Sequence, residues 1–365
     1  FTLLWLGGGL APAFLAPVEY NTLRAIGALP AIFLLLALGS DTLWLQMQRR
    51  FAALTNTRML ALFGVGLLIT GGEMAHAYFV RWAQHPDVRV IYHHHVVALG
   101  RRLDASPDQT PVVISSIYPG EFHDPYTMEV TLRREDLALR WANGRGALFF
   151  PRGESRLYTD TLAPLSPPLR ALIDGEASLA PAATLNFRPD DLHDKLYGYR
   201  WDADAGCDAT LAAMRKDARV AAHDGPPSPY NQAVPLPISY ADAIDLVGYQ
   251  VTPSVAAPGA TVDVITAWEV HAPHPEALTL FSHLIDANNE LVAQVDRLDA
   301  PSWQWQAGDR FVQHHRYTLP ADLAPGDYGF AIGFYRQENF VRLPLAIPID
   351  NLTRVLLPFD VVREP

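Results

Sequence analysis

The sequence contains little cysteine and little charge. Cys207 is the one cysteine among 365 residues, which excludes an intrachain disulfide and any metal site built from several cysteines. Charged residues make up 18% of the chain, below the roughly 25% of soluble proteins. The formal net charge is −11, and no basic stripe with interleaved aromatic residues occurs, which argues against a nucleic-acid partner.

The apolar excess lies almost entirely in the first 80 residues, in long runs. Residues 22–39 and 59–80 are each long enough to cross a hydrocarbon layer of about 30 Å, which takes roughly 20 helical residues. We expect membrane helices over 24–44, kinked at Pro30, and over 59–80. Residues 1–15 are also apolar and contain three consecutive glycines, which let helices approach closely. We expect them to be the remaining part of another membrane helix of a longer protein.

The arginines around these runs give the expected orientation. Arg49, Arg50 and Arg58 lie in the short connection between the two runs, whereas Arg24, Arg81 and Arg89 lie on the other side. Dense positive charge in a short loop favours the cytoplasm. The sequence therefore predicts a cell-membrane protein whose remaining residues are extracytoplasmic.

Residues 83–201 have the mixed pattern of a small α/β domain. Residues 90–103 show helical spacing, 111–116 form a short apolar strand run, and 168–173 fit a short helix. The apolar segments 137–141 and 147–150 flank Asn143-Gly144, which is a hairpin signal. A further strand over 196–201 is expected to complete the sheet.

The rest of the chain predicts a linker and an all-β, Ig-like sandwich. Residues 202–239 are rich in Ala, Asp, Gly and Pro, as in a linker. From residue 240 onward, short alternating segments are separated by turn residues. Tyr328 follows a Pro-Gly turn at a strand start, the pattern of a tyrosine corner. The six expected strands are 244–251, 261–268, 278–285, 311–319, 328–335 and 355–362.

Several segments resemble one enzyme family. Residues 19–30 (EYNTLRAIGALP) resemble the late membrane helices of dolichyl-phosphate-mannose protein mannosyltransferase-like (GT-C) glycosyltransferases. Residues 139–151 (LRWANGRGALFFP) and 319–328 (LPADLAPGDY) resemble extracytoplasmic regions that follow the helices in some bacterial members. The resemblance implies sugar transfer from a polyprenyl-phosphate donor. It also implies that the acidic catalytic residue lies in a first outer loop, upstream of this chain, so none of the residues here is expected to be catalytic.

The first candidate site is at the outer end of the helix over 24–44. Arg24, with Glu19 and Asn21 beside it, is placed to bind the phosphate of a lipid-linked donor by charge-assisted hydrogen bonds. The alternative is an arginine that extends to the membrane interface and pairs locally with Glu19.

A second candidate is the pair Glu73 and His76, three residues apart in the second apolar run. Ionisable residues at membrane depth are usually functional, but this pair is also close enough to Trp82 to lie among headgroups.

The histidines do not form a recognisable metal site. The side chains of His93, His94 and His95 would point about 100° apart on a helix, so they cannot all reach one ion. We therefore predict no metal and no cofactor.

Residues 121–124 bring carboxylates and an imidazole into one loop, where acid–base chemistry is conceivable but turn capping is the simpler interpretation.

The tryptophans allow two interpretations. Trp268, Trp303 and Trp305 fit a sugar-stacking face on the sandwich, but such residues also fill sandwich cores.

Together these observations predict a multi-pass α-helical membrane region (1–82), a small α/β domain (83–201), a linker (202–239) and an Ig-like sandwich (240–365). The expected function is to position the donor or acceptor in a polyprenyl-phosphate-sugar-dependent glycosyltransferase, with the lipid bilayer and the lipid-linked sugar as partners. The alternative is a non-catalytic accessory subunit that packs against other membrane subunits. Whether the chain takes part in an enzyme stays open at this point.

Overall fold

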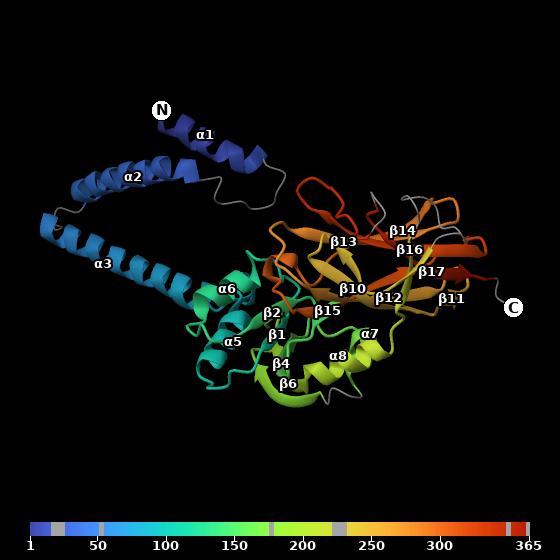
Figure 1. Cartoon of the computed structure of the whole chain (residues 1–365). Coiled ribbons are helices and arrows are strands. Elements are labelled where there is room, and N and C mark those ends of the chain that lie inside the picture. Colours follow the sequence, from blue (N-terminus) through green and yellow to red (C-terminus); the bar gives the residue numbers. More distant parts are fainter. Residues whose placement is uncertain (16–25, 51–54, 175–178, 221–231, 348–351, 363–365) are drawn as a thin grey trace. The chain divides into compact units, whose positions relative to one another are not determined.

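The computed structural model describes residues 1–15, 26–50, 55–174, 179–220, 232–347 and 352–362. The chain divides into two compact units, Phe1–His85 and Pro86–Pro365 (Figure 1). Each unit is described by itself below.

The N-terminal unit consists of helices. These are α1 (Thr2–Leu15), α2 (Leu29–Arg50) and α3 (Asn56–His76), and α3 continues into a π-helical turn over Ala77–Trp82. A Cβ atom added at Gly9 of α1 would lie 2.6 Å from the backbone nitrogen of Ala28. The lack of a side chain at Gly9 therefore allows α1 to approach the backbone just before α2.

Two helices of this unit are long and apolar enough to cross a membrane, over Ile26–Arg50 and Asn56–Trp82. Only 11% and 6% of their most apolar windows are buried, so most of their apolar side chains are exposed within the unit. This composition and exposure allow membrane association. Ser40 and Thr42 donate hydrogen bonds to the Leu36 and Leu38 carbonyls of their own helix, both at 2.8 Å. These bonds satisfy the two hydroxyl groups, for which lipid chains offer no hydrogen-bond partner.

The predicted multi-pass helical membrane region is wrong. Within the described residues, two helices pass the length and composition test, and the rest of the chain is a mixture of helices and several sheets. The kink predicted at Pro30 also has no cause, because Pro30 is the second residue of α2, where a missing N–H leaves no helical bond unmade.

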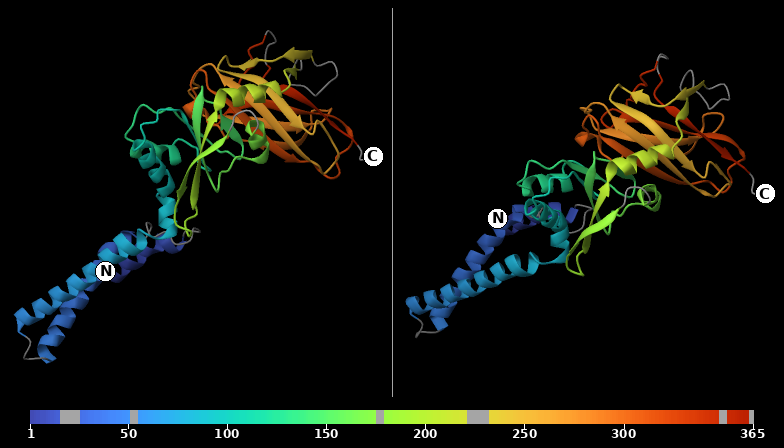
Figure 2. Two further views of the ribbon diagram at one scale, coloured as in Figure 1. Left: turned by 90° about the horizontal axis from the view of Figure 1, so that it is seen from below. Right: turned by 60° about the horizontal axis from the view of Figure 1, so that its bottom comes forward.

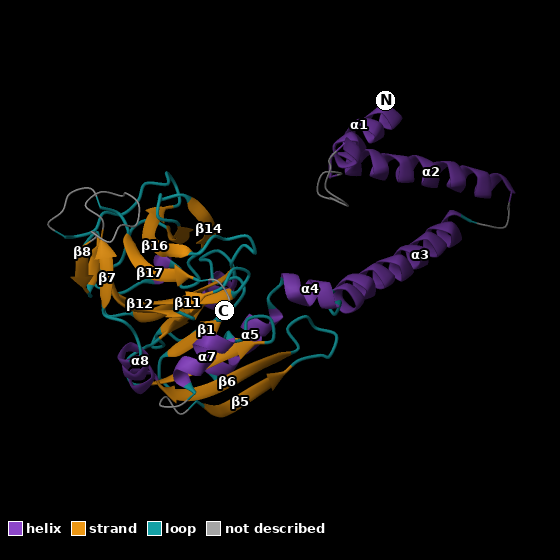
Figure 3. Cartoon of the chain, turned by 90° about the vertical axis from the view of Figure 1, so that its right-hand side faces the viewer, coloured by secondary structure: helices purple, strands orange, loops and turns teal. Residues whose placement is uncertain are grey.

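The C-terminal unit begins with a five-stranded sheet in the order β2-β1-β4-β6-β5. Figure 3 shows β1, β6 and β5 of this sheet. Its strands are β1 (Val112–Ser115), β2 (Leu139–Ala142), β4 (Glu154–Asp160), β5 (Ala180–Asn186) and β6 (Lys195–Asp202). β1 is parallel to both neighbours, and the remaining pairs are antiparallel. The accompanying helices are α4 (Pro86–Ile91), α5 (His94–Asp104), α6 (Asp124–Thr131) and α7 (Pro167–Ile173).

Helices α5 and α6 pack on one face of this sheet. Leu99 of α5 and Met128 of α6 belong to the same buried cluster as Ile114 of β1 and Tyr158 of β4. A Cβ atom added at Gly100 would lie 3.2 Å from the Met128 sulfur, so the absence of a side chain there lets the two helices touch. The packing fixes both helix starts, His94 and Asp124, near the carboxyl end of β1.

Two further sheets form a sandwich. One has the order β3-β15-β12-β10-β9, and the other has the order β14-β13-β16-β17-β7-β8, with β11 paired to β17. The strands are β3 (Ala147–Phe149), β7 (Asp217–Val220), β8 (Gln232–Pro235), β9 (Ile238–Tyr240), β10 (Ile244–Thr252), β11 (Val255–Ala256), β12 (Thr261–Val270), β13 (Leu278–Ile285), β14 (Leu291–Asp296), β15 (Arg310–Thr318), β16 (Gly326–Arg336) and β17 (Val355–Val361).

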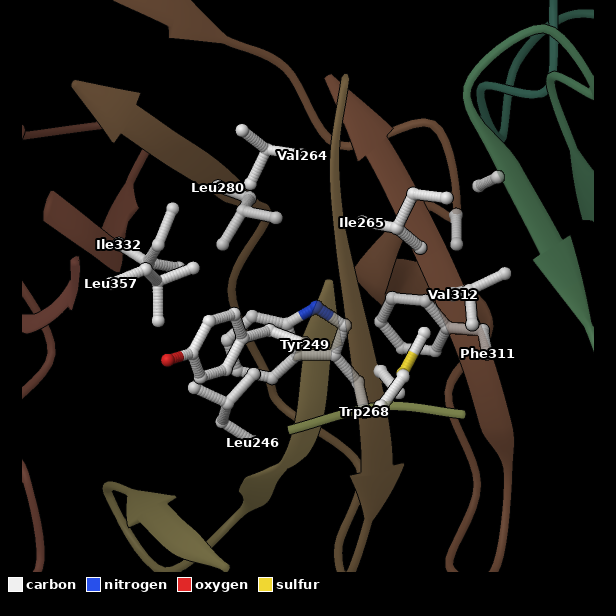
Figure 4. Packing of buried hydrophobic residues seen from close by; sticks show 14 of the residues in the cluster. Leu246, Tyr249, Val264, Ile265, Trp268, Leu280, Phe311, Val312, Ile332 and Leu357 are labelled. Atoms are coloured by element: carbon white, nitrogen blue, oxygen red, sulfur yellow. The ribbon is translucent and has the colours of Figure 1, made fainter. Parts of the chain in front are cut away.

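The core between these two sheets is aromatic. The Trp268 ring of β12 lies 4.8 Å from Phe334 of β16, edge to face, and the Tyr240 hydroxyl donates a 2.8 Å hydrogen bond to the Ile332 carbonyl. Figure 4 shows Trp268 with other residues of this core, among them Leu280, Ile332 and Leu357. The outer face of the β12 sheet is also covered. Figure 2 shows α8 (Ala203–Ala212), in yellow-green, beside the strands of the sandwich. Cys207 of α8 belongs to the same core, and burial raises the pKa of its thiol to about 11.

The hairpin predicted at Asn143-Gly144 is wrong. β2 pairs with β1, whereas β3 pairs with β15 of the sandwich. The Gly144 N–H donates to the Ser115 hydroxyl at 2.8 Å, so the chain turns here from one sheet into another. A single buried cluster contains Val113 of the first sheet and Leu357 of the sandwich, which means that the α/β stretch and the sandwich share a core.

Other local predictions are confirmed. The six strands predicted in the sandwich are β10, β12, β13, β15, β16 and β17, and β6 joins the first sheet as expected. The Tyr328 hydroxyl donates a 2.7 Å hydrogen bond to the Ala324 carbonyl, which is the tyrosine corner. The linker predicted over 202–239, in contrast, is not what its described residues form: they include α8, β7 and β8, and β7 and β8 extend a sandwich sheet.

The buried His315 predicts acid sensitivity of the sandwich. Its side chain is 2% exposed, its Nε2 lies 3.0 Å from the Arg297 carbonyl oxygen, and burial lowers its pKa to about 3. The folded chain therefore keeps His315 neutral where the unfolded chain takes up a proton. We expect the free energy of unfolding to fall as the pH drops from about 6.5 toward 3, by up to roughly 1.4 kcal/mol per pH unit from this group.

Denaturant unfolding at pH 7, 5 and 4 checks this expectation against His315→Gln, whose amide can still donate to Arg297. The variant should lose stability less steeply than the wild type over this range. Equal slopes would exclude His315 as the source.

Candidate functional site

A groove of about 870 Å³ opens between α6, the segment before β2 and the loop before β15. Its surface combines aromatic, acidic and basic side chains. Trp303 contributes the exposed aromatic ring, with 38% of its surface accessible, and its indole N–H donates a 3.2 Å hydrogen bond to the Pro119 carbonyl. The charged lining residues are Glu121, Glu129, Arg133, Arg134, Glu135 and Arg140.

The wall of the groove is held by side-chain amides and an ion pair. Gln304 acts as an extra strand partner, because its Nε2 donates to the Trp141 carbonyl at 2.6 Å and its Oε1 accepts from the Trp141 N–H at 2.7 Å. Arg140 donates to both carboxylate oxygens of Asp309, at 2.9 and 2.8 Å, and to the Gln306 side chain at 2.8 Å. These bonds join β2 of the first sheet to the loop before β15.

The three tryptophans considered as a sugar-stacking face lie in different places. Trp268 and Trp305 are 1% and 2% exposed and pack in the sandwich core, where their rings contact Phe334. Trp305 also borders the groove, but its side chain is buried, and Trp303 is the one of the three that is exposed there. The core interpretation holds for two of them, and the binding interpretation stays available for Trp303.

A second feature is a buried cluster at the carboxyl edge of the parallel strands. His95, Asp160 and His193 lie in α5, at the end of β4 and just before β6, and their ligand atoms are all within 4.8 Å of one another. The rings of His95 and His193 stack with centroids 3.7 Å apart. Asp160 Oδ1 accepts hydrogen bonds from the Leu162 and Ala163 N–H groups at 2.6 and 2.5 Å, and Oδ2 lies 3.1 Å from His193 Nδ1.

Asp124 adjoins this cluster. One carboxylate oxygen accepts a hydrogen bond from the Ser116 hydroxyl and lies 3.7 Å from His95 Nε2, and the other shares a hydrogen bond with His93 Nδ1. Burial acts to raise the pKa of Asp124, but the contacts with His95 and Ser116 outweigh it, so the pKa lies below its ordinary value. His93 reaches this position through a left-handed backbone conformation, with φ of 47°.

His94 lies outside this cluster and contacts Asp191 instead. Its Nε2 lies 3.2 Å from an Asp191 oxygen, and Arg89 donates two hydrogen bonds to the same carboxylate, at 2.6 and 2.7 Å. The hydrogen bond from Arg89 lowers the pKa of Asp191 to about 2. Burial, reinforced by the Arg89 charge, lowers the pKa of His94.

The membrane-segment candidates remain predictions. Arg24, Glu19 and Asn21 lie outside the described residues. Glu73 and His76 are exposed on α3, and the Glu73 carboxylate lies 3.8 Å from the Arg81 guanidinium. Such an exposed ion pair is typical of a solvated or headgroup-level surface.

The sequence indicated some residues of the Trp303 groove and of the buried histidine cluster but not the others. His93–His95, the 121–124 segment and Trp303 were singled out, but Ser116, Asp160, His193 and Gln304 were not. Ser116 carried a usable signal, because it directly follows the apolar strand run of β1, and the carboxyl ends of parallel strands lie at one edge of a sheet. Asp160 ends β4, whose mostly polar sequence ESRLYTD gave no such signal. His193 and Gln304 lie in loops whose position depends on the tertiary fold.

Comparisons with known proteins give no family assignment. No protein-family model and no curated protein matches the chain. Solved structures similar to part of it include the C-terminal domain of wzt, with 13% identity, 34% of this chain, 75% of that chain and a TM-score of 0.24. A Niemann-Pick type C2 protein from the Japanese carpenter ant has 6% identity, 33% and 91% coverage and a TM-score of 0.22. The CARDB domain of a Pyrococcus furiosus protein has 13% identity, 32% and 90% coverage and a TM-score of 0.21. These scores are too low to carry an argument about function.

Proposed function

We propose that this chain is a membrane-associated part of a glycosyltransferase that uses a polyprenyl-phosphate sugar, and that it holds a glycan acceptor in the Trp303 groove. The groove is the observation that carries the proposal. An exposed indole ring offers a flat apolar platform for a sugar ring, and the carboxylates and guanidinium groups around it match sugar hydroxyls. The contribution to catalysis would be the positioning of the acceptor, not bond making.

The apolar helices support the membrane part of the proposal. A lipid-linked donor must be used at a bilayer, and two helices of sufficient length and apolarity are present. Arg49 and Arg50 end α2, and Arg58 lies in the first turn of α3. By the positive-inside tendency we place this connection in the cytoplasm and residues 86–365 on the extracytoplasmic side.

Cysteine labelling checks the orientation. A Cys207→Ala background removes the native thiol, and Asn339→Cys then provides an exposed site in the C-terminal unit. A membrane-impermeant maleimide should label Asn339→Cys in intact cells but label Thr57→Cys, at the start of α3, only after lysis. Labelling in the reverse pattern would reverse the orientation.

Binding of a short mannose oligosaccharide to the full chain in lipid nanodiscs tests the function of the groove. A mannose oligosaccharide is chosen as the probe because the enzymes that the sequence resembles are mannosyltransferase-like; the resemblance itself leaves the sugar and the acceptor open. We expect saturable binding in calorimetry and a weakening of about tenfold in Trp303→Ala, or about 1.4 kcal/mol, because the stacking platform is lost.

The matched control is Phe340→Ala, which removes an exposed aromatic ring outside the groove lining and should leave binding unchanged. If Trp303→Ala binds as well as the wild type, the groove has no part in glycan recognition. The interpretation as a non-catalytic accessory subunit would then be favoured.

A further inference from the structure

The buried cluster of His95, Asp160 and His193 contains polar atoms that the protein itself does not satisfy. His95 is 5% exposed, and neither of its ring nitrogens has a hydrogen-bond partner among the described residues. A buried polar group without a partner costs roughly 1–3 kcal/mol. Its neighbour His193 is also buried and stacks against it at 3.7 Å. The two rings are nearly parallel, with an interplanar angle of 14°, so one ring must turn for a nitrogen of each to reach the same ion.

The charges around the two rings favour a cation. Asp160 and Asp124 are 2% and 1% exposed, so both carboxylates are removed from bulk water. The Leu162 and Ala163 N–H groups orient Asp160, and the Ser116 hydroxyl donates a hydrogen bond to Asp124. Buried carboxylates are expected to be paired with positive charge or to coordinate a metal. His93 meets one oxygen of Asp124, while the other oxygen faces His95 at 3.7 Å.

The set of ligand atoms selects a class of ion. Imidazole nitrogen combined with carboxylate oxygen suits Zn²⁺ and related divalent transition metals, whereas Mg²⁺ and Ca²⁺ prefer oxygen alone. The ligand atoms of the three residues are all within 4.8 Å of one another, and small side-chain movements would bring them to the roughly 3.3 Å that separates two ligands on a tetrahedral ion with bonds of about 2.0–2.1 Å. They come from α5, β4 and the loop before β6, so an ion would join three segments that are distant in sequence.

The position in the fold agrees with this chemistry. Asp160 is the last residue of β4, and Ser116, which bonds Asp124, directly follows β1. β1 and β4 are parallel neighbours. Ligands of α/β sheets bind beyond the carboxyl ends of such strands.

We infer that His95, His193 and Asp160 bind a Zn²⁺-type divalent transition-metal ion, with Asp124 beside it as a further oxygen ligand or as the hydrogen-bonding partner of His95. The inference is independent of the groove. It also explains how the His93–His95 triplet contributes to one site although its side chains diverge: only His95 enters the cluster, while His93 and His94 turn to Asp124 and Asp191.

The full chain, purified in detergent, tests the inference with ZnCl₂ and CoCl₂ as probes. We expect about one Zn²⁺ per chain by elemental analysis, a thermal midpoint raised by at least about 5 °C over the EDTA-treated protein, and visible Co²⁺ absorption typical of a site with nitrogen ligands. His95→Gln and His193→Gln should each weaken Zn²⁺ binding by at least about 100-fold, because each removes one nitrogen ligand.

The control is His271→Gln, because His271 also pairs with a carboxylate, Asp245, at 2.7 Å but lies outside the cluster. It should bind Zn²⁺ like the wild type. Wild-type protein that takes up less than about 0.1 equivalent and shows no Co²⁺ absorption would overturn the inference, whether or not the cluster variants fold. Full Zn²⁺ binding by folded His95→Gln and His193→Gln would overturn it as well.

Discussion

Replacing Trp268 with alanine should lower the free energy of unfolding of the C-terminal unit by about 3–5 kcal/mol. Trp268 is 1% exposed, and its ring packs edge to face on Phe334 and against Tyr240, with centroids 4.8 and 5.7 Å away. Its indole N–H donates to the Thr266 hydroxyl at 2.8 Å. The substitution therefore leaves a cavity between the two sandwich sheets and removes a buried hydrogen bond. Denaturant unfolding followed by circular dichroism measures the change.

Trp303→Ala is the matched control, because it removes the same side chain from a position that is 38% exposed. We expect it to change the free energy of unfolding by less than about 1 kcal/mol. The two variants thus separate a structural tryptophan from a binding one. A similar loss of stability in both would mean that Trp303 supports the fold and would weaken its assignment to the groove.

The sequence predicted the positions of the sandwich strands well, but it did not predict which elements cover the two faces of those strands. Alternation and turn residues are local signals, and they placed β10, β12, β13, β15, β16 and β17. β12 is buried along nearly its whole length, because one face meets the other sheet through Trp268 while the Ala267 face is covered by α8. A strand covered on both faces loses its simple polar alternation. The roles of Trp268 and Trp303 therefore depended on tertiary contacts.

The error at Asn143-Gly144 has a similar origin. An Asn-Gly pair between two apolar segments favours a hairpin, and the signal depends only on the residues at the turn. Here Ser115, at the end of β1, accepts a hydrogen bond from Gly144, and β3 finds its partner in β15, more than 160 residues away in the chain. A partner that distant leaves no mark on the local pattern.

In the helical unit, hydropathy predicts the apolar helices but not the number of times the chain crosses a membrane. Both apolar runs became helices, but neither their count nor a long apolar start establishes a multi-pass region. Three consecutive histidines cannot all reach one ion, as expected, but one of them can join residues from other segments. His95 meets Asp160 and His193, which lie 65 and 98 residues further along, and no spacing rule connects such positions.

Gln304→Ala should destabilise the C-terminal unit by about 2–4 kcal/mol and open the edge of its first sheet. Gln304 is 8% exposed, and its amide makes both hydrogen bonds of the Trp141 backbone on the free side of β2. Alanine would leave a donor and an acceptor unpaired in a buried place, each costing roughly 1–3 kcal/mol, with part of the cost recovered if water enters from the groove. Hydrogen exchange should show the Trp141 amide losing protection before other amides of β1 and β2.

Gln306→Ala is the appropriate comparison, because Gln306 lies two residues away on the same loop and accepts only one side-chain hydrogen bond, from Arg140, at an exposed position. Its expected cost is below about 1 kcal/mol. Gln304→Glu keeps the size and the acceptor but sets a carboxylate oxygen against the Trp141 carbonyl, so it should be nearly as damaging as alanine. If Gln304→Glu is as stable as the wild type, the amide is not the link between β2 and the loop that carries Trp303. The wall of the groove would then depend on Arg140 instead, because its hydrogen bonds to Asp309 and Gln306 also join the two segments.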